Sequence, residues 1–84
     1  MSWQIQIEKR ALKALEGLPA ADRQRVRVAI RGLAVDPRPR GCKKLEDSEY
    51  WRIRVGVYRV VYGIEKKRLL ILVVRIGHRR EVYR

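Results

Sequence analysis

The chain has 84 residues and a formal net charge of +12, with 21 Lys and Arg against 9 Asp and Glu. A chain of this length builds one modest core, so we expect a single domain over residues 1–84. Its one cysteine excludes an internal disulfide and a zinc site of paired cysteines, and we expect neither metal nor cofactor. The charge favours an anionic partner, with nucleic acid the default candidate.

Three features of the sequence predict a cytoplasmic protein. The first residues lack the layout of a signal peptide, and the longest apolar run, residues 69–74, is too short to span a bilayer. A single cysteine fits a reducing compartment. We therefore expect no export and no membrane association.

The chain opens with one predicted strand and two predicted helices. Polar and apolar residues alternate over residues 2–7, which is the period of a half-buried strand. From residue 8 the period becomes helical, and the segment around Gly17 and Pro19 separates a first helix from a second that ends before Pro37. Two helices with so short a connection form a helical hairpin. The hairpin residues expected to face the sheet are Leu12, Leu15, Val26, Ile30 and Leu33.

The second half of the chain predicts a sheet. Residues 36–49 form a loop with a short extended piece at residues 43–45. Strands follow at residues 50–55, from residue 57 or 58 to residue 64, and at residues 69–76. The order β-α-α-β-β-β predicts an α+β domain. Its sheet should be curved and mainly antiparallel, with the helical hairpin packed on one face.

A two-residue turn at Gly56-Val57 sets the register of the next two strands and places Arg54 opposite Arg59. Alternation along the strands then sends Arg52, Arg54 and Arg59 to the face away from the helices. Opposed like charges repel by about 0.2–1 kcal/mol, and a bound phosphate would reverse the sign. We therefore expect a free, anion-binding sheet face, with an ordinary solvated face as the alternative. The side chains expected to face the helices include Trp51, Ile53, Val60 and Tyr62.

The position of Arg75 stays open at this point. A four-residue turn before the last strand places Arg75 among the core side chains, whereas a three-residue turn places it beside Arg59. Either turn delivers the segment Gly77-His-Arg-Arg at the far end of the strand.

These residues resemble the RelE/ParE toxin superfamily, and in particular its RelE-like branch of mRNA interferases from type II toxin–antitoxin systems. The resemblance covers nearly the whole chain, and its clearest segments are residues 50–62 and 76–83. It implies a RelE-like fold and a toxin that inhibits translation by cutting mRNA in the ribosomal A site. The cut needs no metal, because the ribose 2′-OH attacks the adjacent phosphate. The resemblance also implies a RelB-like antitoxin in a toxin–antitoxin hetero-oligomer.

The resemblance also implies roles for single residues. Arg59 stabilises the scissile phosphate, Arg79 acts on the leaving oxygen or its phosphate, and Tyr83 stacks against an mRNA base. Arg52 and Arg54 stand where RelE-like enzymes often have lysines. Because arginine stays protonated, these two side chains hold phosphate but make poor general bases.

His78 is the only histidine and is our candidate for the general base, because histidine exchanges a proton near neutral pH. We expect it to lie among arginines that disfavour its cationic form. The alternative is a surface histidine that only binds phosphate or a backbone carbonyl. Tyr83 and Glu81 are the remaining candidates for proton transfer, with pairing to Arg79 or Arg80 as the alternative for Glu81. The remaining candidates for RNA or phosphate binding are Arg80, Lys43 and Lys44.

Two other functions remain open. One is a ParE-like poison of DNA gyrase, which is not an enzyme and does not need a basic and aromatic C-terminal cluster. The other is a catalytically degenerate toxin that serves only as an antitoxin-binding module, which the arginines at lysine positions would fit.

Overall fold

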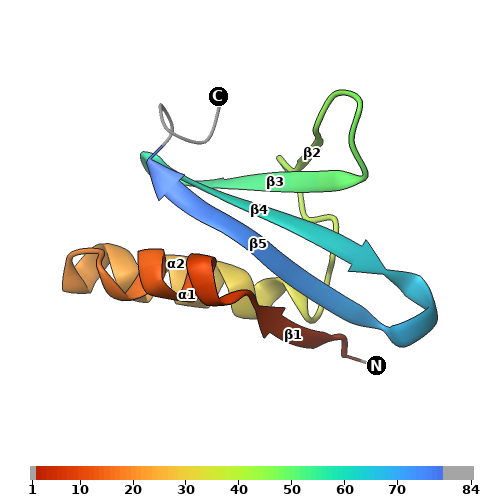
Figure 1. The fold of residues 1–84 in the computed structure, drawn as a ribbon, viewed down its shortest axis with the longest axis horizontal. Helices are drawn as coiled ribbons and strands as arrows, with labels where there is room; N and C mark the ends of the chain where they lie inside the picture. Colours follow the sequence, from red (N-terminus) through yellow and green to blue (C-terminus); the bar gives the residue numbers. More distant parts are fainter. Residues whose placement is uncertain (1, 79–84) are drawn as a thin grey trace.

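The computed structural model describes residues 2–78, in which two helices pack on one side of a five-stranded sheet (Figure 1). The α+β prediction and the order β-α-α-β-β-β are confirmed, with one very short strand added. No helix in this part of the chain is long and apolar enough to cross a membrane. The elements are β1 (Gln4–Ile7), α1 (Lys9–Glu16), α2 (Ala20–Leu33), β2 (Lys43–Lys44), β3 (Tyr50–Val55), β4 (Tyr58–Glu65), a 3₁₀ turn η1 (Lys66–Arg68) and β5 (Leu70–His78).

The sheet has the strand order β1-β5-β4-β3-β2. Strand β1 runs parallel to β5, and every other pair is antiparallel, so the prediction of a mainly antiparallel sheet is confirmed. Strands β4 and β5 occupy the middle of the sheet. They therefore carry most of its buried apolar residues.

The core lies between the helices and one face of the sheet. Ile53, Val60 and Tyr62 are buried there as predicted, and Trp51 packs partly buried at their side. Helix α2 contributes Val26, Ile30 and Leu33, and α1 contributes Ala11 and Leu15.

The prediction for Leu12 is wrong, because its side chain is 38% exposed. Helix α1 has only two turns and directs one stripe, Ala11 and Leu15 at positions i and i+4, into the core. Leu12 lies about 100° around the helix from Ala11. It therefore sits at the margin of the core, where it lines a groove with β1.

The β3–β4 hairpin has the predicted register. Arg54 lies opposite Arg59, and Ile53 lies opposite Val60. Gly56 in the turn has a φ of +61°, in the left-handed region that glycine adopts without strain. The two opposed arginines therefore face away from the helices, as expected.

A β-bulge between β4 and β5 decides where Arg75 lies. Four residues, 66–69, connect these strands, and Glu65 pairs with Leu70. Farther along, Tyr62 pairs with Val73 while Val61 pairs with Arg75, so Val74 is an extra residue. The bulge reverses the consequence expected of the four-residue turn. Arg75 is exposed on the face away from the helices, and no unpaired charge enters the core.

Candidate functional site

The candidate site is the sheet face turned away from the helices. Alternation along the strands directs Arg52 and Arg54 of β3, Arg59 of β4 and Arg75 of β5 toward this face. We call these four residues the arginine face. Three neighbouring strands thus bring together cations that are far apart in the sequence.

The two predicted lysines lie on different sides of the sheet. Lys43 pairs with Arg52, so it belongs to the same side as the arginine face, at the β2 edge. Lys44 pairs with Trp51, whose ring is on the helix side. Both lysines are exposed.

The expectation that the arginines form a free surface is wrong for two of them. Arg59 is only 1% exposed and Arg52 only 7%, whereas Arg54 and Arg75 are exposed. The Nε and Nη2 atoms of Arg59 are among the buried atoms. A guanidinium shielded from water acts on a nearby charge more strongly than one in bulk solvent. The face therefore combines two shielded cations with two that solvent reaches.

A long hydrogen bond positions one of the shielded arginines. Arg52 Nη1 donates to the carbonyl oxygen of Gly41 at 3.4 Å. This contact connects β3 to the loop that precedes β2, and the positive φ of Gly41, +91°, shapes that loop.

His78 does not lie on the arginine face in this structure. It pairs with Tyr58, and the two rings meet edge to face with centroids 6.2 Å apart. Its neighbour Gly77 is the residue that pairs with Arg59. Arg79 and Arg80, two of the arginines expected around His78, lie outside the described residues, so the expectation of a histidine among arginines stays a prediction.

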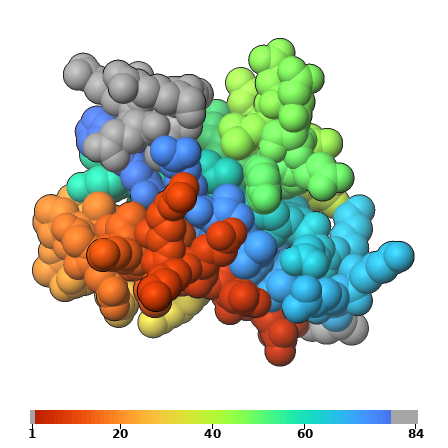
Figure 2. Space-filling view, in the orientation of Figure 1, coloured from red at the N-terminus to blue at the C-terminus, as the bar shows by residue number. Residues whose placement is uncertain are grey.

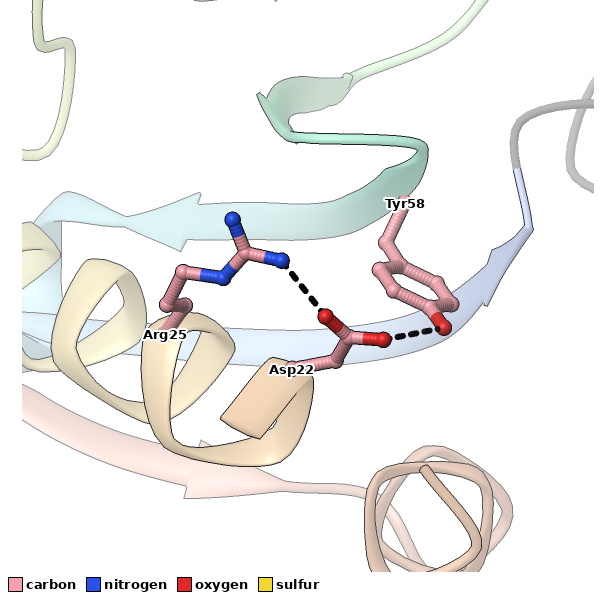
Figure 3. Close-up of polar contacts among 3 residues, drawn as sticks. All are labelled: Asp22, Arg25 and Tyr58. Atoms are coloured by element: carbon pink, nitrogen blue, oxygen red, sulfur yellow. Dashed lines mark hydrogen bonds and ion pairs between the residues drawn. The ribbon is translucent and has the colours of Figure 1, made fainter. Parts of the chain in front are cut away.

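A polar cluster joins helix α2 to the β3–β4 hairpin (Figure 3). The Tyr58 hydroxyl donates to Asp22 Oδ2 at 2.9 Å, and Arg25 Nη2 donates to Asp22 Oδ1 at 2.5 Å. The hydrogen bond from Arg25, followed by that from Tyr58, holds the pKa of Asp22 below its ordinary value. The same bond to Asp22 raises the pKa of Tyr58. Sequence reasoning missed this cluster, because nothing local links Asp22 to a tyrosine 36 residues later.

A second tyrosine fixes the loop after α2. The Tyr62 hydroxyl donates to the carbonyl oxygen of Pro37 at 2.6 Å. Burial, above all, raises the pKa of Tyr62, and the thiol of Cys42 adds to the shift. The hydroxyl therefore stays a neutral donor that ties the loop to β4.

The predicted residues Arg79, Arg80, Glu81 and Tyr83 lie outside the described residues, so the structure does not place them. Among residues 2–78, no three His, Cys, Asp or Glu side chains are grouped as metal ligands would be.

Comparison with known proteins identifies the family. A family model described as "ParE toxin of type II toxin-antitoxin system, parDE" matches residues 5–83. The chain belongs to the RelE/ParE superfamily of toxins. It is 31% identical to the RelE1 toxin of Methanocaldococcus jannaschii over 88 residues, which cover 100% of this chain and 98% of that protein.

Solved RelE structures have the same fold. The archaeal RelE–RelB complex from Pyrococcus horikoshii contains a chain with a TM-score of 0.83 and 32% identity, covering 94% of this chain and 97% of that one. The isolated RelE toxin of E. coli has a TM-score of 0.82 over 98% of this chain and 92% of its own, at 23% identity. This RelE-like chain therefore shares its fold even with distant members.

Proposed function

We propose that this RelE-like toxin is a ribosome-dependent endoribonuclease of the cytoplasm that cleaves mRNA in the A site. The observation that carries the proposal is the arginine face. Its four arginines come from three adjacent strands and lie on the same side of the sheet. Similarity to archaeal RelE toxins over nearly the full chain supports it.

The proposed reaction is transesterification within the RNA. The ribose 2′-OH loses its proton to a base and attacks the adjacent phosphorus, the bond to the 5′-oxygen breaks, and that oxygen takes up a proton. A 2′,3′-cyclic phosphate remains. Negative charge grows on the phosphorane oxygens, and preorganised guanidinium groups stabilise it more strongly in the transition state than in the substrate.

Each candidate residue has a role in this scheme. Arg59 stabilises the phosphorane, and Arg52 and Arg54 hold the flanking phosphates. His78 accepts or returns a proton. The other assigned roles are those of Arg79 at the leaving oxygen, Tyr83 stacked on a base, and Arg75, Arg80, Lys43 and Lys44 along the RNA backbone.

The burial of Arg59 bears on where the reaction occurs. A side chain that is 1% exposed reaches a phosphate only if its surroundings rearrange. His78, which packs against Tyr58, also has to approach the RNA. Both requirements favour an enzyme that is nearly silent on naked RNA and acts where the ribosome positions the substrate.

The proposed partner is a RelB-like antitoxin. An apolar groove of about 260 Å³ lies between β1 and the two helices, lined by Ile5, Leu12 and Leu15 among others and flanked by Arg27 and Arg31. An amphipathic segment with acidic flanks matches such a groove in both polarity and charge. The P. horikoshii relative was solved together with RelB.

The decisive experiment adds purified protein to translating ribosomes and maps the new 5′ ends of the mRNA. We expect cleavage within the A-site codon. DNA breaks without mRNA cleavage would indicate a gyrase poison instead, and harmless expression without antitoxin would indicate a binding module.

A further inference from the structure

A hollow of about 600 Å³ lies on the same side of the sheet as the arginine face, at the end where β3 begins and β4 ends. Gly63 of β4 and Leu72 of β5 line it from the sheet, and Tyr50 and the loop before β3 line it from the side. We call it the Tyr50 pocket. That loop stands on the side of the sheet opposite the helices (Figure 1). In Figure 2 it projects (green) above the β4–β5 turn (light blue).

The Tyr50 ring lies across β4. Tyr50 pairs with Gly63, and its Cε1 atom is 3.3 Å from the position that a Cβ on Gly63 would occupy. A side chain at position 63 would therefore push the ring away. The ring thus lies against Gly63, and the residue remains 42% exposed. A supported, accessible aromatic ring is the platform on which proteins stack the bases of single-stranded nucleic acid.

The spacing along β3 connects this platform to the arginine face. Tyr50 and Arg52 are two residues apart on the same side of the strand, which separates them by about 6.6 Å. One nucleotide reaches across such a distance. A base stacked on Tyr50 therefore leaves its phosphate near the guanidinium groups of β3.

The charge in the pocket is opposite to that of the arginine face. Asp47, Glu49 and Glu65 line it, although the whole chain carries +12. Carboxylates repel phosphate but accept hydrogen bonds from the exocyclic amino groups of bases. Glu65 also contacts Arg68 at 3.4 Å, which leaves Asp47 and Glu49 as the better-placed acceptors. The Tyr50 pocket thus favours the edge of a base, and the arginine face favours the phosphate backbone of the nucleic acid.

We propose that the Tyr50 pocket binds an amino-bearing nucleobase of single-stranded RNA, with its phosphate on the arginine face. The inference rests on the proposed function and adds a base subsite to it. Tyr50 supplies stacking, Gly63 gives the ring its place, and the carboxylates of Asp47 and Glu49 select for the amino group.

The test measures binding of short oligo(C) and oligo(U) RNA to the purified protein by fluorescence anisotropy. Cytosine and uracil have rings of equal size, but cytosine carries an amino group where uracil has a carbonyl oxygen. We expect oligo(C) to bind more tightly. Tyr50→Ala should weaken its binding about 5- to 150-fold, the range for loss of one stacked base. Tyr50→Phe should keep most of the affinity, and Val57→Ala, an exposed control at the hairpin turn, should change nothing.

Two further variants test the geometry without removing the ring. Gly63→Ala should displace Tyr50 and reproduce part of the Tyr50→Ala loss. Asp47→Ala combined with Glu49→Ala should erase the preference for oligo(C). Circular dichroism of each variant checks that the fold is retained.

Three outcomes would refute the proposed base binding at the Tyr50 pocket. They are equal binding of the two RNAs by the wild-type protein, no measurable binding of either RNA, and full affinity in Tyr50→Ala. Cleavage on ribosomes, measured in parallel, separates the two proposals. If mRNA is cleaved but RNA binding does not depend on Tyr50, only the proposed base subsite is refuted. If oligo(C) binding depends on Tyr50 but no mRNA is cleaved, the base subsite is supported and the endonuclease proposal is refuted.

Discussion

Among single residues, Arg59 combines a charge with almost complete burial. Arg59 lies on β4, the central strand of the sheet, which holds its backbone in place. Because its side chain is shielded from water, its positive charge acts more strongly on groups at the sheet surface. Arg54 opposite it remains exposed, so the pair offers one fixed and one adaptable guanidinium.

Replacing Arg59 tests the electrostatic part of the proposed chemistry. We expect Arg59→Ala to slow single-turnover mRNA cleavage on saturating ribosomes roughly 10²- to 10³-fold, the loss typical of one transition-state donor. Arg68→Ala is the matched control, because Arg68 lies on η1 and contacts Glu65. A normal rate in Arg59→Ala would refute the endonuclease proposal.

Replacing His78 tests proton transfer. We expect His78→Ala to slow cleavage about 10²- to 10⁴-fold at saturating ribosomes and to flatten the acidic limb of the pH–rate profile. Tyr58→Phe keeps the ring beside His78 and serves as the comparison. A variant with weaker binding but an unchanged single-turnover rate would restrict His78 to phosphate binding.

At the scale of elements, the bulge at Val74 decides which face of the sheet the end of β5 presents. A one-residue shift reverses the direction of every later side chain in β5. It brings Arg75 to the arginine face and takes His78 to the side of Tyr58. The bulge therefore decides which chemical groups share a surface.

Packing of β4 against the helices can be tested at Val60, which is fully buried. We expect Val60→Ala to lower the free energy of unfolding by about 1–3 kcal/mol, because it removes apolar contacts and leaves a cavity. Urea denaturation measures the loss. Val57→Ala in the exposed turn should leave the midpoint nearly unchanged, and an equal midpoint in both variants would contradict the packing described.

The contact between α2 and the hairpin makes stability depend on pH through Asp22. Because folding lowers the pKa of this carboxyl, its stabilising contribution is complete above the ordinary value near 3.8 and is lost as pH falls through the lowered value. We expect Asp22→Asn to be less stable than wild type at pH 5–7, with the difference shrinking below pH 3.8. Urea midpoints across pH measure it, with the exposed Glu16→Gln as control. A pH-independent difference would contradict the linkage.

Local patterns predicted the elements and the Arg54–Arg59 pairing, because a two-residue glycine turn leaves the hairpin one favoured register. The burial of Arg59 and Arg52 could not be predicted, since alternation along a strand fixes the side of the sheet but not how far a side chain is covered. The place of His78 could not be predicted either, because no local signal marks the bulge at Val74. Leu12 was wrongly predicted to be buried, because a helix of two turns contains too few residues for the hydrophobic pattern to define its buried face.

At the scale of the whole molecule, two surfaces of different chemistry lie on opposite sides of the sheet. The arginine face and the Tyr50 pocket lie on one side, and the apolar groove with Arg27 and Arg31 lies among the helices and β1. Substitutions should therefore alter the proposed antitoxin binding and the proposed RNA binding separately.

A charge reversal in the groove tests this separation. We expect Leu12→Glu to weaken binding of the cognate antitoxin roughly tenfold or more, because it places a carboxylate where an acidic, apolar partner would pack. Cleavage on ribosomes should stay near the wild-type rate. Val28→Glu on the exposed surface of α2 is the control. Isothermal titration calorimetry measures the affinity, and unchanged binding in Leu12→Glu would exclude the groove as the antitoxin site.

The parallel pairing of β1 with β5 has a consequence for the synthesis of the protein. Residues 4–7 leave the ribosome early, but their partners, residues 70–73, are translated more than sixty residues later. Until then β1 has no neighbour in the sheet, and β4 lacks the strand that contributes Arg75 and Gly77. Such long-range contacts form late in folding. A nascent chain therefore cannot complete the arginine face until β5 has been made.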